Sequence, residues 1–513
     1  MSARRVVVVG GGMVGARLAE ELAARADGAT RVTVVGAEPH EPYNRVLLSE
    51  VVGGAVDPDS VWLPAAPSAR VRRGVRVTAV DRGRRLVHCD DGSTVGYDAL
   101  VLATGARARI PATPGLVDGA GQLARGAYAL RTLDDARAVA DAARHRPAAV
   151  VLGGGVLGIE VATGLAARGL AVTVVHGGPH LMDRQLDAVG ASALAVALGR
   201  LGIAVRAGAR VGAVRSGEEG VRGVELADGE RIACGLLVVS AGAVPETALA
   251  SAAGLAVGRG ILVDAALATS DPAVFAVGDC AEPPEGCTGL VAQGWAQARR
   301  LAAALAGGPR AAATDATADD PVDVVRVKAH GVAVAAMGAA DAGLLPGARR
   351  LMLAEEGGTR HVSVVVRDGV LVGATCVGDA AVAADLTATY TRRTPVPRDP
   401  ATLLLRPVPG AVPVEASSPT RMPDRATVCR CNGVAKGDVV ASWRAGARSV
   451  PEVVRATRAT TGCGGCADLV AGLVDWLERA DPDPAGAERP DLTVPASAPC
   501  GRVFAAETPV AAG

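Results

Sequence analysis

Short apolar runs separated by glycine turns characterise the first third of the chain. The run at Arg5–Gly10 predicts a buried strand, Gly10–Gly15 predicts a turn, and Ala16–Ala24 predicts a helix. A second apolar run, Arg31–Val35, predicts a strand that leads toward Glu38. A strand, a glycine turn, a helix, a strand and an acid in this order are typical of a βαβ unit that binds a dinucleotide.

The same pattern returns further along the chain. Ala148–Leu152 predicts a strand, Gly153–Gly158 predicts a glycine turn followed by a helix through Arg168, and Leu170–Val175 predicts the next strand. Two such units form an internal repeat, and this architecture binds two nucleotides. Further strands are predicted at Val75–Val80, Arg85–Cys89, Ala99–Leu102, Leu236–Ser240 and Val274–Val277.

The second half of the chain predicts smaller units joined by linkers. Gly307–Pro321 is rich in Gly, Ala and Asp and predicts a linker, and Pro395–Pro423 predicts another because it is rich in proline. Between them, Val322–Asp379 alternates as strands, with hairpin signals at Glu356–Gly358 and Asp368–Gly369.

Four cysteines stand close together near the C-terminus, among predicted helices. They are arranged as Cys429-x-Cys431 and Cys463-x-x-Cys466. Four thiolates are what a [2Fe–2S] cluster requires, and a zinc ion would use the same set. A redox-active pair of Cys463 and Cys466 would leave the other two unexplained. The apolar positions between the pairs, Trp443 and Val450–Val454, predict core rather than cofactor contacts.

Composition narrows the class of protein further. A length of 513 residues predicts three or four domains. The formal charge is zero, which argues against a nucleic-acid or acidic membrane partner. No signal-peptide pattern precedes the first strand, and no apolar stretch reaches the about 20 residues that span a bilayer, so we expect a cytoplasmic protein.

Two further features of the composition carry no predicted chemistry. Of the 53 Lys and Arg residues only residues 328 and 436 are Lys, which we interpret as a compositional bias. The remaining cysteines stand singly and predict small buried hydrophobes or bystanders; they are Cys89, Cys234, Cys280, Cys287, Cys376 and Cys500.

Three glycines and one acid carry the chemistry of the first turn. Gly10 permits the tight turn, Gly12 lets a phosphate approach the backbone, and Gly15 lets helix and strand pack closely. The helix N-terminus then faces the pyrophosphate, and Glu38 accepts hydrogen bonds from a ribose hydroxyl. The strand after the second turn ends in His176 instead of an acid, which leaves NADH and NADPH both open.

Several segments match known families: Glu41–Ser49, Leu102–Gly105, Leu130–Asp135, Leu181–Asp187, Val277–Cys280, Val325–Gly338 and Val370–Asp379. In order and combination they resemble the FAD- and NAD(P)H-binding portion of assimilatory nitrite reductase large subunits, and equally the electron-transfer subunit of assimilatory nitrate reductase. The cysteine segment, Val428–Gly437 through Thr461–Cys466, resembles a BFD-like [2Fe–2S] domain.

The resemblance implies a fold and its division into domains. The fold is α/β, a two-dinucleotide-binding-domain flavoprotein of the glutathione-reductase-like kind, with a small α+β third domain and a small helical [2Fe–2S] domain. The expected domains are FAD-binding at 1–120 and 244–310, NAD(P)H-binding at 121–243, an interface domain at 320–395, the BFD-like domain at 425–480, and a flexible tail at 481–513.

The resemblance also assigns site residues, and Glu246 departs from it because relatives commonly have Asn there. No protein acid or base is assigned, since the cofactors carry the hydride and electron transfer. The metal ligands are Cys429, Cys431, Cys463 and Cys466. To NAD(P)H it assigns Gly153, Gly155, Gly158, Glu160, His176 and Gly242. To FAD it assigns Gly10, Gly12, Gly15, Glu38, Arg45, Ser49, Val77, Thr104, Gly105, Arg131, Gly278, Asp279 and Val291.

The implied function is electron transfer from NAD(P)H through FAD and the cluster to a separate nitrate reductase, or nitrite reductase, catalytic protein. No Cys-x4-Cys pair follows the first βαβ unit, so a disulfide mechanism has no residues to use. Only Cys500 follows Cys466, whereas sirohaem-dependent nitrite reduction needs four further cysteines, so we expect no such reduction by this chain alone. Alternatives are a free-standing NAD(P)H:ferredoxin reductase or NAD(P)H oxidase, and a non-enzymatic nucleotide-binding regulator. The oligomeric state is left open.

Overall fold

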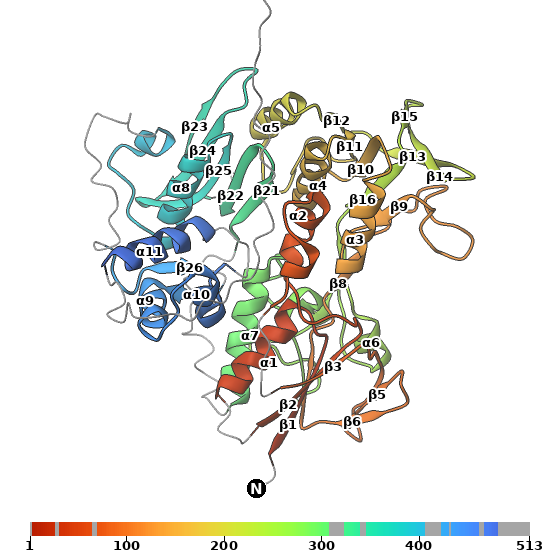
Figure 1. Ribbon diagram of the computed structural model, residues 1–513, viewed down its shortest axis with the longest axis vertical. Coiled ribbons are helices and arrows are strands. Elements are labelled where there is room, and N and C mark those ends of the chain that lie inside the picture. Colours follow the sequence, from red (N-terminus) through yellow and green to blue (C-terminus); the bar gives the residue numbers. More distant parts are fainter. Residues whose placement is uncertain are drawn as a thin grey trace, which may run out of the picture.

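The protein is seen in a computed structural model that describes residues 3–25, 30–63, 69–306, 323–338, 345–405, 422–429, 432–460 and 466–480. Figure 1 shows two domains of sheet and helix, a third domain built on a separate sheet, and a group of helices near the C-terminal end of the described chain. The predicted linker at Gly307–Pro321 and the predicted tail from Asp481 lie outside the described residues.

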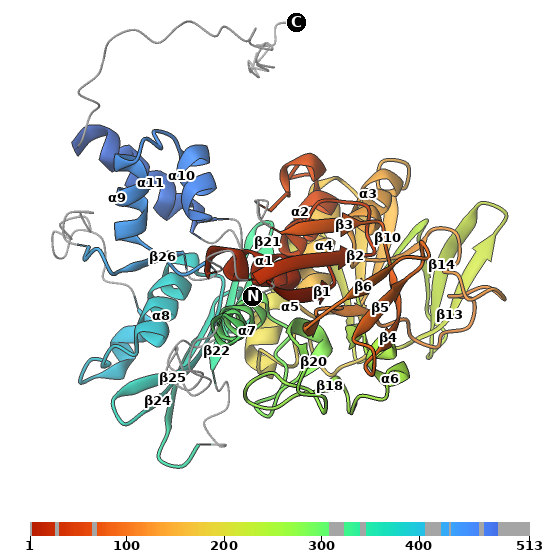
Figure 2. The same cartoon turned by 90° about the horizontal axis from the view of Figure 1, so that it is seen from below.

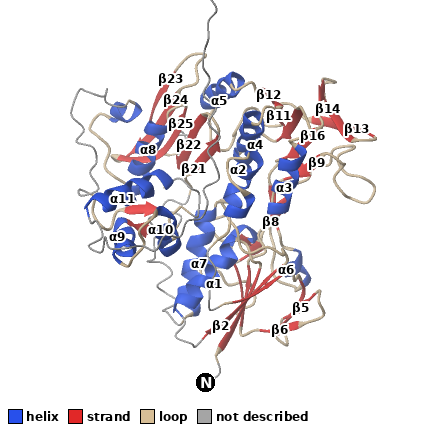
Figure 3. Ribbon diagram, in the orientation of Figure 1, coloured by secondary structure: helices blue, strands red, loops and turns tan. Residues whose placement is uncertain are grey.

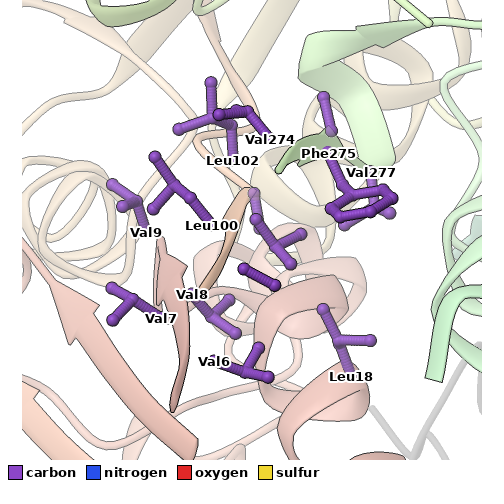
Figure 4. Close-up of a cluster of buried hydrophobic side chains, with 14 of the residues drawn as sticks. Val6, Val7, Val8, Val9, Leu18, Leu100, Leu102, Val274, Phe275 and Val277 are labelled. Atoms are coloured by element: carbon purple, nitrogen blue, oxygen red, sulfur yellow. The ribbon is translucent and has the colours of Figure 1, made fainter. Parts of the chain in front are cut away.

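The first domain is built on a parallel sheet in the order β19-β7-β1-β2-β3. Helices α1 (Met13–Arg25) and α7 (Val291–Leu305) pack side by side along it (Figures 1 and 2). The central strands are apolar along their length because both faces of the sheet are covered, and Figure 4 shows the resulting core. The strands are β1 (Arg4–Val9), β2 (Thr30–Gly36), β3 (Arg70–Arg73), β7 (Ala99–Leu102) and β19 (Val274–Ala276).

The second domain repeats this plan with a parallel sheet in the order β12-β11-β10-β16-β9. The predicted strand at Leu236–Ser240 is β16 (Leu236–Val239), which lies inside the sheet. Two short strands that the apolar pattern did not indicate, β9 (Ala127–Ala129) and β12 (Ala204–Ala207), form the edges. The other elements are β10 (Ala148–Leu152), β11 (Ala171–His176), α3 (Leu133–Ala142), α4 (Val156–Ala167) and α5 (Ala188–Arg200).

The third domain is an antiparallel sheet in the order β21-β22-β25-β24-β23, with α8 (Ala380–Arg392) packed against it. Both predicted hairpins are confirmed. The proline-rich segment predicted as a linker differs in part, because Pro400–Leu404 forms a 3₁₀ turn and Leu404 is buried in the core of this domain. The strands are β21 (Val325–Ala329), β22 (Val332–Gly338), β23 (Arg349–Ala354), β24 (His361–Arg367) and β25 (Val370–Val377).

The C-terminal unit, called the cysteine module below, is a hairpin and three helices. Trp443 and Val453 are buried in it, as predicted for core positions. Figure 2 shows the module beside α1 and α8. Its elements are β26 (Thr427–Cys429), β27 (Val434–Ala435), α9 (Lys436–Arg444), α10 (Val450–Thr457) and α11 (Ala467–Ala480).

Shorter elements complete the first two domains (Figure 3). The antiparallel pair β8 (Ala106–Ala108) and β17 (Ala243–Pro245) lies where the chain crosses between the domains. Within the described ranges, every helix is too short or too polar to cross a lipid bilayer. The remaining elements are α2 (Leu48–Gly53), α6 (Ala248–Ala252), β4 (Val77–Asp81), β5 (Leu86–Cys89), β6 (Thr94–Gly96), β13 (Val211–Gly217), β14 (Gly220–Leu226), β15 (Arg231–Ala233), β18 (Ile261–Leu262) and β20 (Ala281–Glu282).

A buried histidine makes the third domain sensitive to acid. His361 on β24 is fully buried, and burial together with the positive charge of Arg350 lowers the pKa of His361 to about 4. Its Nε2 is hydrogen-bonded with Thr375 Oγ1 at 3.2 Å. The carboxylate of Asp187, 3.7 Å from this nitrogen, is itself paired with Arg350.

We therefore expect stability to fall as the pH is lowered. The unfolded chain binds a proton at His361 near pH 6.5 and the folded chain only near pH 4. The stability that comes from keeping His361 neutral in the folded state is fully present above pH 6.5 and is lost as the pH falls toward 4. About 2 kcal/mol of the free energy of unfolding is lost between pH 7 and 5. Urea unfolding at both pH values should show this loss in the parent protein and much less in His361→Gln. An equal loss in both would contradict the assignment.

Candidate functional site

A cavity of about 1050 Å³ opens at the first glycine turn, beside the carboxyl ends of β1, β2 and β7. In open parallel sheets, ligands bind at this end of the strands. Of the residues assigned to FAD by resemblance, Gly15 and Ser49 are not among those that line the cavity. Those that line it are Gly10, Gly12, Glu38, Arg45, Val77, Thr104, Gly105, Arg131, Gly278, Asp279 and Val291.

The shape of the glycine turn explains why Gly15 is absent from the lining. Gly10 has a φ of +116°, and a Cβ there would lie 2.1 Å from the Ala103 carbonyl oxygen. A Cβ on Gly15 would lie 2.0 Å from the carbonyl oxygen of Gly10. Gly15 therefore lets α1 pack on the strand end, while the N-terminus of α1 stays open to an anion.

Acidic and basic side chains alternate around the cavity wall. Glu38, which follows β2, pairs with Arg45 and accepts a hydrogen bond from the Tyr43 hydroxyl at 2.6 Å. The Arg45 guanidinium also stacks over the Tyr43 ring, 4.8 Å from its centroid. Burial raises the pKa of Tyr43. These contacts hold the Glu38 carboxylate at the strand end, where a ribose would be bound.

A second ion pair also lines the cavity. Asp279 lies in a 3₁₀ turn directly after β19, and its carboxylate accepts a hydrogen bond from Arg131 at 2.5 Å. The Nε of Arg131 donates to the carbonyl oxygen of Ala106 at 2.8 Å. Arg131 thus links the start of the second domain to the cavity of the first, and the pair presents both a carboxylate and a guanidinium to a ligand.

Ser49 and Glu160 are brought together with each other, away from the cavity lining. Ser49 donates to the Glu160 carboxylate at 2.6 Å, and both side chains are buried. Lys328 of the third domain contacts the same carboxylate through Nζ at 2.7 Å and through its backbone N–H at 2.9 Å. Burial raises the pKa of the neighbouring Glu50. Three domains therefore meet at one buried carboxylate.

Both lysines of the chain make specific contacts. Lys328 makes an ion pair with Glu160, and Lys436, 6% exposed, donates to the carbonyl oxygen of Met422 at 2.8 Å. Both lysines therefore take part in structural contacts.

The second glycine turn has the same backbone geometry as the first. A Cβ on Gly153 would lie 2.2 Å from the Ser240 carbonyl oxygen, and one on Gly158 would lie 1.9 Å from that of Gly153. Gly155 is the N-cap of α4, and Gly242 has a φ of +102°. His176 is at the end of β11, where its Nδ1 accepts a hydrogen bond from the Gly154 N–H at 3.2 Å.

Two of the four predicted cluster ligands lie in the described part of the module, both buried. Nitrogen donors point at their sulfurs: Thr460 N–H lies 3.2 Å from Cys466 Sγ, and the side-chain amide of Asn432 lies 3.7 Å from Cys429 Sγ. A hydrogen bond from Cys466 lowers the pKa of Cys429 to about 6, against the effect of burial. Cys431 and Cys463 lie outside the described residues.

The other described cysteines behave differently from this pair. Burial raises the pKa of Cys234 and of Cys376 to about 11, and raises that of Cys280. Cys89 is buried as well, and Cys287 is exposed. Cys500 lies outside the described residues. Buried sulfurs that receive nitrogen donors fit [2Fe–2S] ligands, and Cys429 and Cys466 each have such a donor.

One hydrophobic cluster joins the cavity to these cysteines. Met13, at the start of α1, lines the cavity and belongs to the same buried cluster as Cys429 and Cys466. Val291, at the start of α7, lines the cavity and packs against this cluster. Trp295 on α7 is part of it, and its indole N–H donates to the Met13 carbonyl oxygen at 3.2 Å.

Two family models match the chain. The pyridine nucleotide-disulphide oxidoreductase model matches residues 4–302, more than half of the sequence. The chain belongs to this family. The BFD-like [2Fe-2S] binding domain model matches residues 427–476 of the same chain. The protein is therefore a flavoprotein oxidoreductase that uses FAD and NAD(P)H, with a [2Fe–2S]-binding domain near its C-terminus.

Relatives extend this similarity over most of the oxidoreductase. The nitrite reductase [NAD(P)H] large subunit of Klebsiella oxytoca is 34% identical over 92% of this chain and 49% of its own length. The assimilatory nitrate reductase electron transfer subunit of Bacillus subtilis is 29% identical over 94% of this chain and 61% of its own. The chain thus spans about half to three fifths of the length of these curated relatives.

A solved structure shows the same fold. The crystal structure of a covalent putidaredoxin reductase–putidaredoxin complex matches with a TM-score of 0.69 and 26% identity, over 80% of this chain and 97% of that one. These matches confirm the predicted resemblance and fold class.

Proposed function

We propose that this oxidoreductase delivers electrons from NAD(P)H to a separate nitrate reductase catalytic protein or, as the second choice, to a separate nitrite reductase. The names of the curated relatives support both acceptors. The observation that carries the proposal is the hydrophobic cluster in which Met13 of the cavity wall packs with Cys429 and Cys466. It supplies a continuous apolar connection between the cavity wall and the cysteine ligands.

The cavity residues would hold FAD in two parts. The turn at Gly10 and Gly12 and the N-terminus of α1 would bind the pyrophosphate, and Glu38 would accept hydrogen bonds from the ribose. The flavin end would lie along Thr104, Gly105, Arg131, Gly278, Asp279 and Val291, with Arg45 and Val77 on the remaining walls. Ser49 would not contact FAD, but would hold the Glu160 carboxylate in place through its hydrogen bond. The turn at Gly153–Gly158 would receive the nicotinamide nucleotide.

Bound FAD supplies hydride acceptance and release of single electrons, and the cluster accepts and passes on single electrons. No acid or base of the protein is needed for this chemistry. The protein contributes placement: the Asp279–Arg131 pair shapes the flavin end, and the module holds Cys429 and Cys466 in the same buried cluster as Met13. Water is excluded where these apolar side chains are buried.

Stepwise anaerobic reduction tests the proposal. Mixing with NADH or NADPH should bleach the flavin absorbance and then produce the electron paramagnetic resonance (EPR) signal of a reduced [2Fe–2S] cluster. Adding a nitrate reductase catalytic protein and nitrate should reoxidise both and yield nitrite. NADH consumption under air that does not change on this addition would favour a free-standing oxidase or ferredoxin reductase. A flavin that no nicotinamide nucleotide bleaches would favour a regulator.

Asp279→Ala is expected to weaken FAD binding. The substitution removes the carboxylate from the cavity wall and leaves the Arg131 guanidinium without this partner. The Asp279 carboxylate would accept a charge-assisted hydrogen bond from FAD. Losing that bond costs about 1.5–3 kcal/mol, which corresponds to about a tenfold or greater loss of FAD affinity. The ratio of flavin to protein after dialysis measures it. Asp141→Ala, on the exposed face of α3, is the control, and an Asp279→Ala protein that retains full flavin would refute the assignment.

A further inference from the structure

One side chain connects the reductase body to a predicted cluster ligand. Asn432 belongs to the cysteine module, between β26 and β27, and is 9% exposed. Its side-chain oxygen accepts a hydrogen bond from Arg17 Nη1 of α1 at 3.3 Å. Its side-chain nitrogen donates to Cys429 Sγ at 3.7 Å. A single amide therefore links helix α1 to the sulfur.

The surroundings determine which way this amide points. A guanidinium has only donors, so the atom of Asn432 that faces Arg17 must be the oxygen. The NH₂ group is then directed into the module, where it meets the Cys429 sulfur and donates to the carbonyl oxygen of Arg458. Arg17 thus imposes the orientation in which a donor faces the sulfur.

Arg17 is itself held in place. Its guanidinium pairs with Glu21 one turn along α1 at 2.6 Å, and lies over the Trp295 ring at 5.9 Å from the centroid. Its side chain is only 11% exposed. A second contact joins the same two parts of the molecule, because Arg458 of the module forms an ion pair with Glu20 of α1. The module is therefore seated on α1 by charged as well as apolar contacts.

We propose that Asn432 is a positioning residue through which the seating of the module on α1 raises the electron affinity of the cluster. The inference rests on the proposed function. A reduced cluster carries one more negative charge than an oxidised one, so a donor on a ligand sulfur stabilises the reduced form more strongly. The Arg17 contact keeps that donor on the Cys429 sulfur.

Redox titration of the full chain, followed by the EPR signal of the cluster, tests the proposal. Asn432→Leu should lower the electron affinity of the cluster about tenfold, which is a midpoint about 59 mV more negative for a one-electron couple. Arg17→Met should shift the midpoint in the same direction by a smaller amount. Adding Arg17→Met to Asn432→Leu should cause no further shift, because the two side chains act through one amide.

Arg25→Met is the matched control. Arg25 also lies on α1 and also pairs with Glu21, and within the described part of the chain it makes no hydrogen bond or ion pair with the module. The redox midpoint of the cluster in Arg25→Met should equal that of the parent protein. A shift equal to that of Arg17→Met would show that only the charge of α1 matters, and would overturn the proposal.

Two results separate this inference from the function on which it rests. Protein that contains zinc and no iron would overturn the proposed function. Protein with normal iron and sulfide whose midpoint is the same in Arg17→Met and the parent would overturn only the role of Asn432. Arg17 lies outside the module, so this measurement decides the question even if Asn432→Leu fails to assemble a cluster.

Discussion

Cys429→Ala is expected to abolish electron delivery to a protein acceptor while NAD(P)H still reduces the flavin. Cys429 is 2% exposed, receives a hydrogen bond from Asn432, and is the described ligand with a lowered thiol pKa. Alanine removes the metal-binding sulfur, and structural thiolate sites do not tolerate a missing ligand. Iron and acid-labile sulfide should fall to background, and nitrite formation with an added nitrate reductase catalytic protein should fall with them.

The control for this variant is another cysteine of the same chain. Cys287 is exposed, so Cys287→Ala should leave iron, sulfide and delivery unchanged. Stopped-flow mixing with NADH should give the same rate of flavin bleaching in both variants. Loss of flavin reduction in Cys429→Ala with a normal iron content would reverse the proposed order of electron transfer.

Lys328→Met is expected to destabilise the protein strongly. Glu160 is 4% exposed, and Lys328 supplies its ammonium partner from the third domain. Removing one partner of a buried ion pair leaves an uncompensated charge, which costs about 3–5 kcal/mol. The midpoint of thermal unfolding should fall, and it should recover in the double variant Lys328→Met/Glu160→Gln, because the remaining amide carries no charge.

A neighbouring substitution separates this effect from damage to the strand. Arg326 lies two residues away on β21 and is exposed, so Arg326→Met should change the free energy of unfolding by no more than about 0.5 kcal/mol. If Lys328→Met were equally mild, the buried ion pair would contribute little to the stability of the protein.

The parts of the fold that could be predicted are those with a strong local pattern. The strands β1, β7 and β10 are continuous apolar runs because both faces of their sheets are covered. The turns at Gly10 and Gly153 need a positive φ and close backbone contact, which only glycine meets without strain. The cysteine spacing alone is enough to indicate a metal-binding unit.

The short strands at the sheet edges were not predicted because their local pattern is weak. The strands β9 and β12 have three and four residues, too few to show any periodicity. Leu404 joins the core of the third domain from a proline-rich segment, where composition favoured a linker. In each case the neighbouring sheet or core, and not the local sequence, selects the conformation.

The sequence alone thus determined the local chemistry: which segments become strands, where the phosphates of a dinucleotide meet a helix, and which thiols belong together. The partners of individual side chains were decided only by folding. Ser49, Glu160 and Lys328 meet across sequence separations of 111 and 168 residues, and Arg17 reaches Asn432 across 415. Such contacts arise because burial forces each charged group to find a counterpart wherever the packed domains supply one, and no local pattern records that choice.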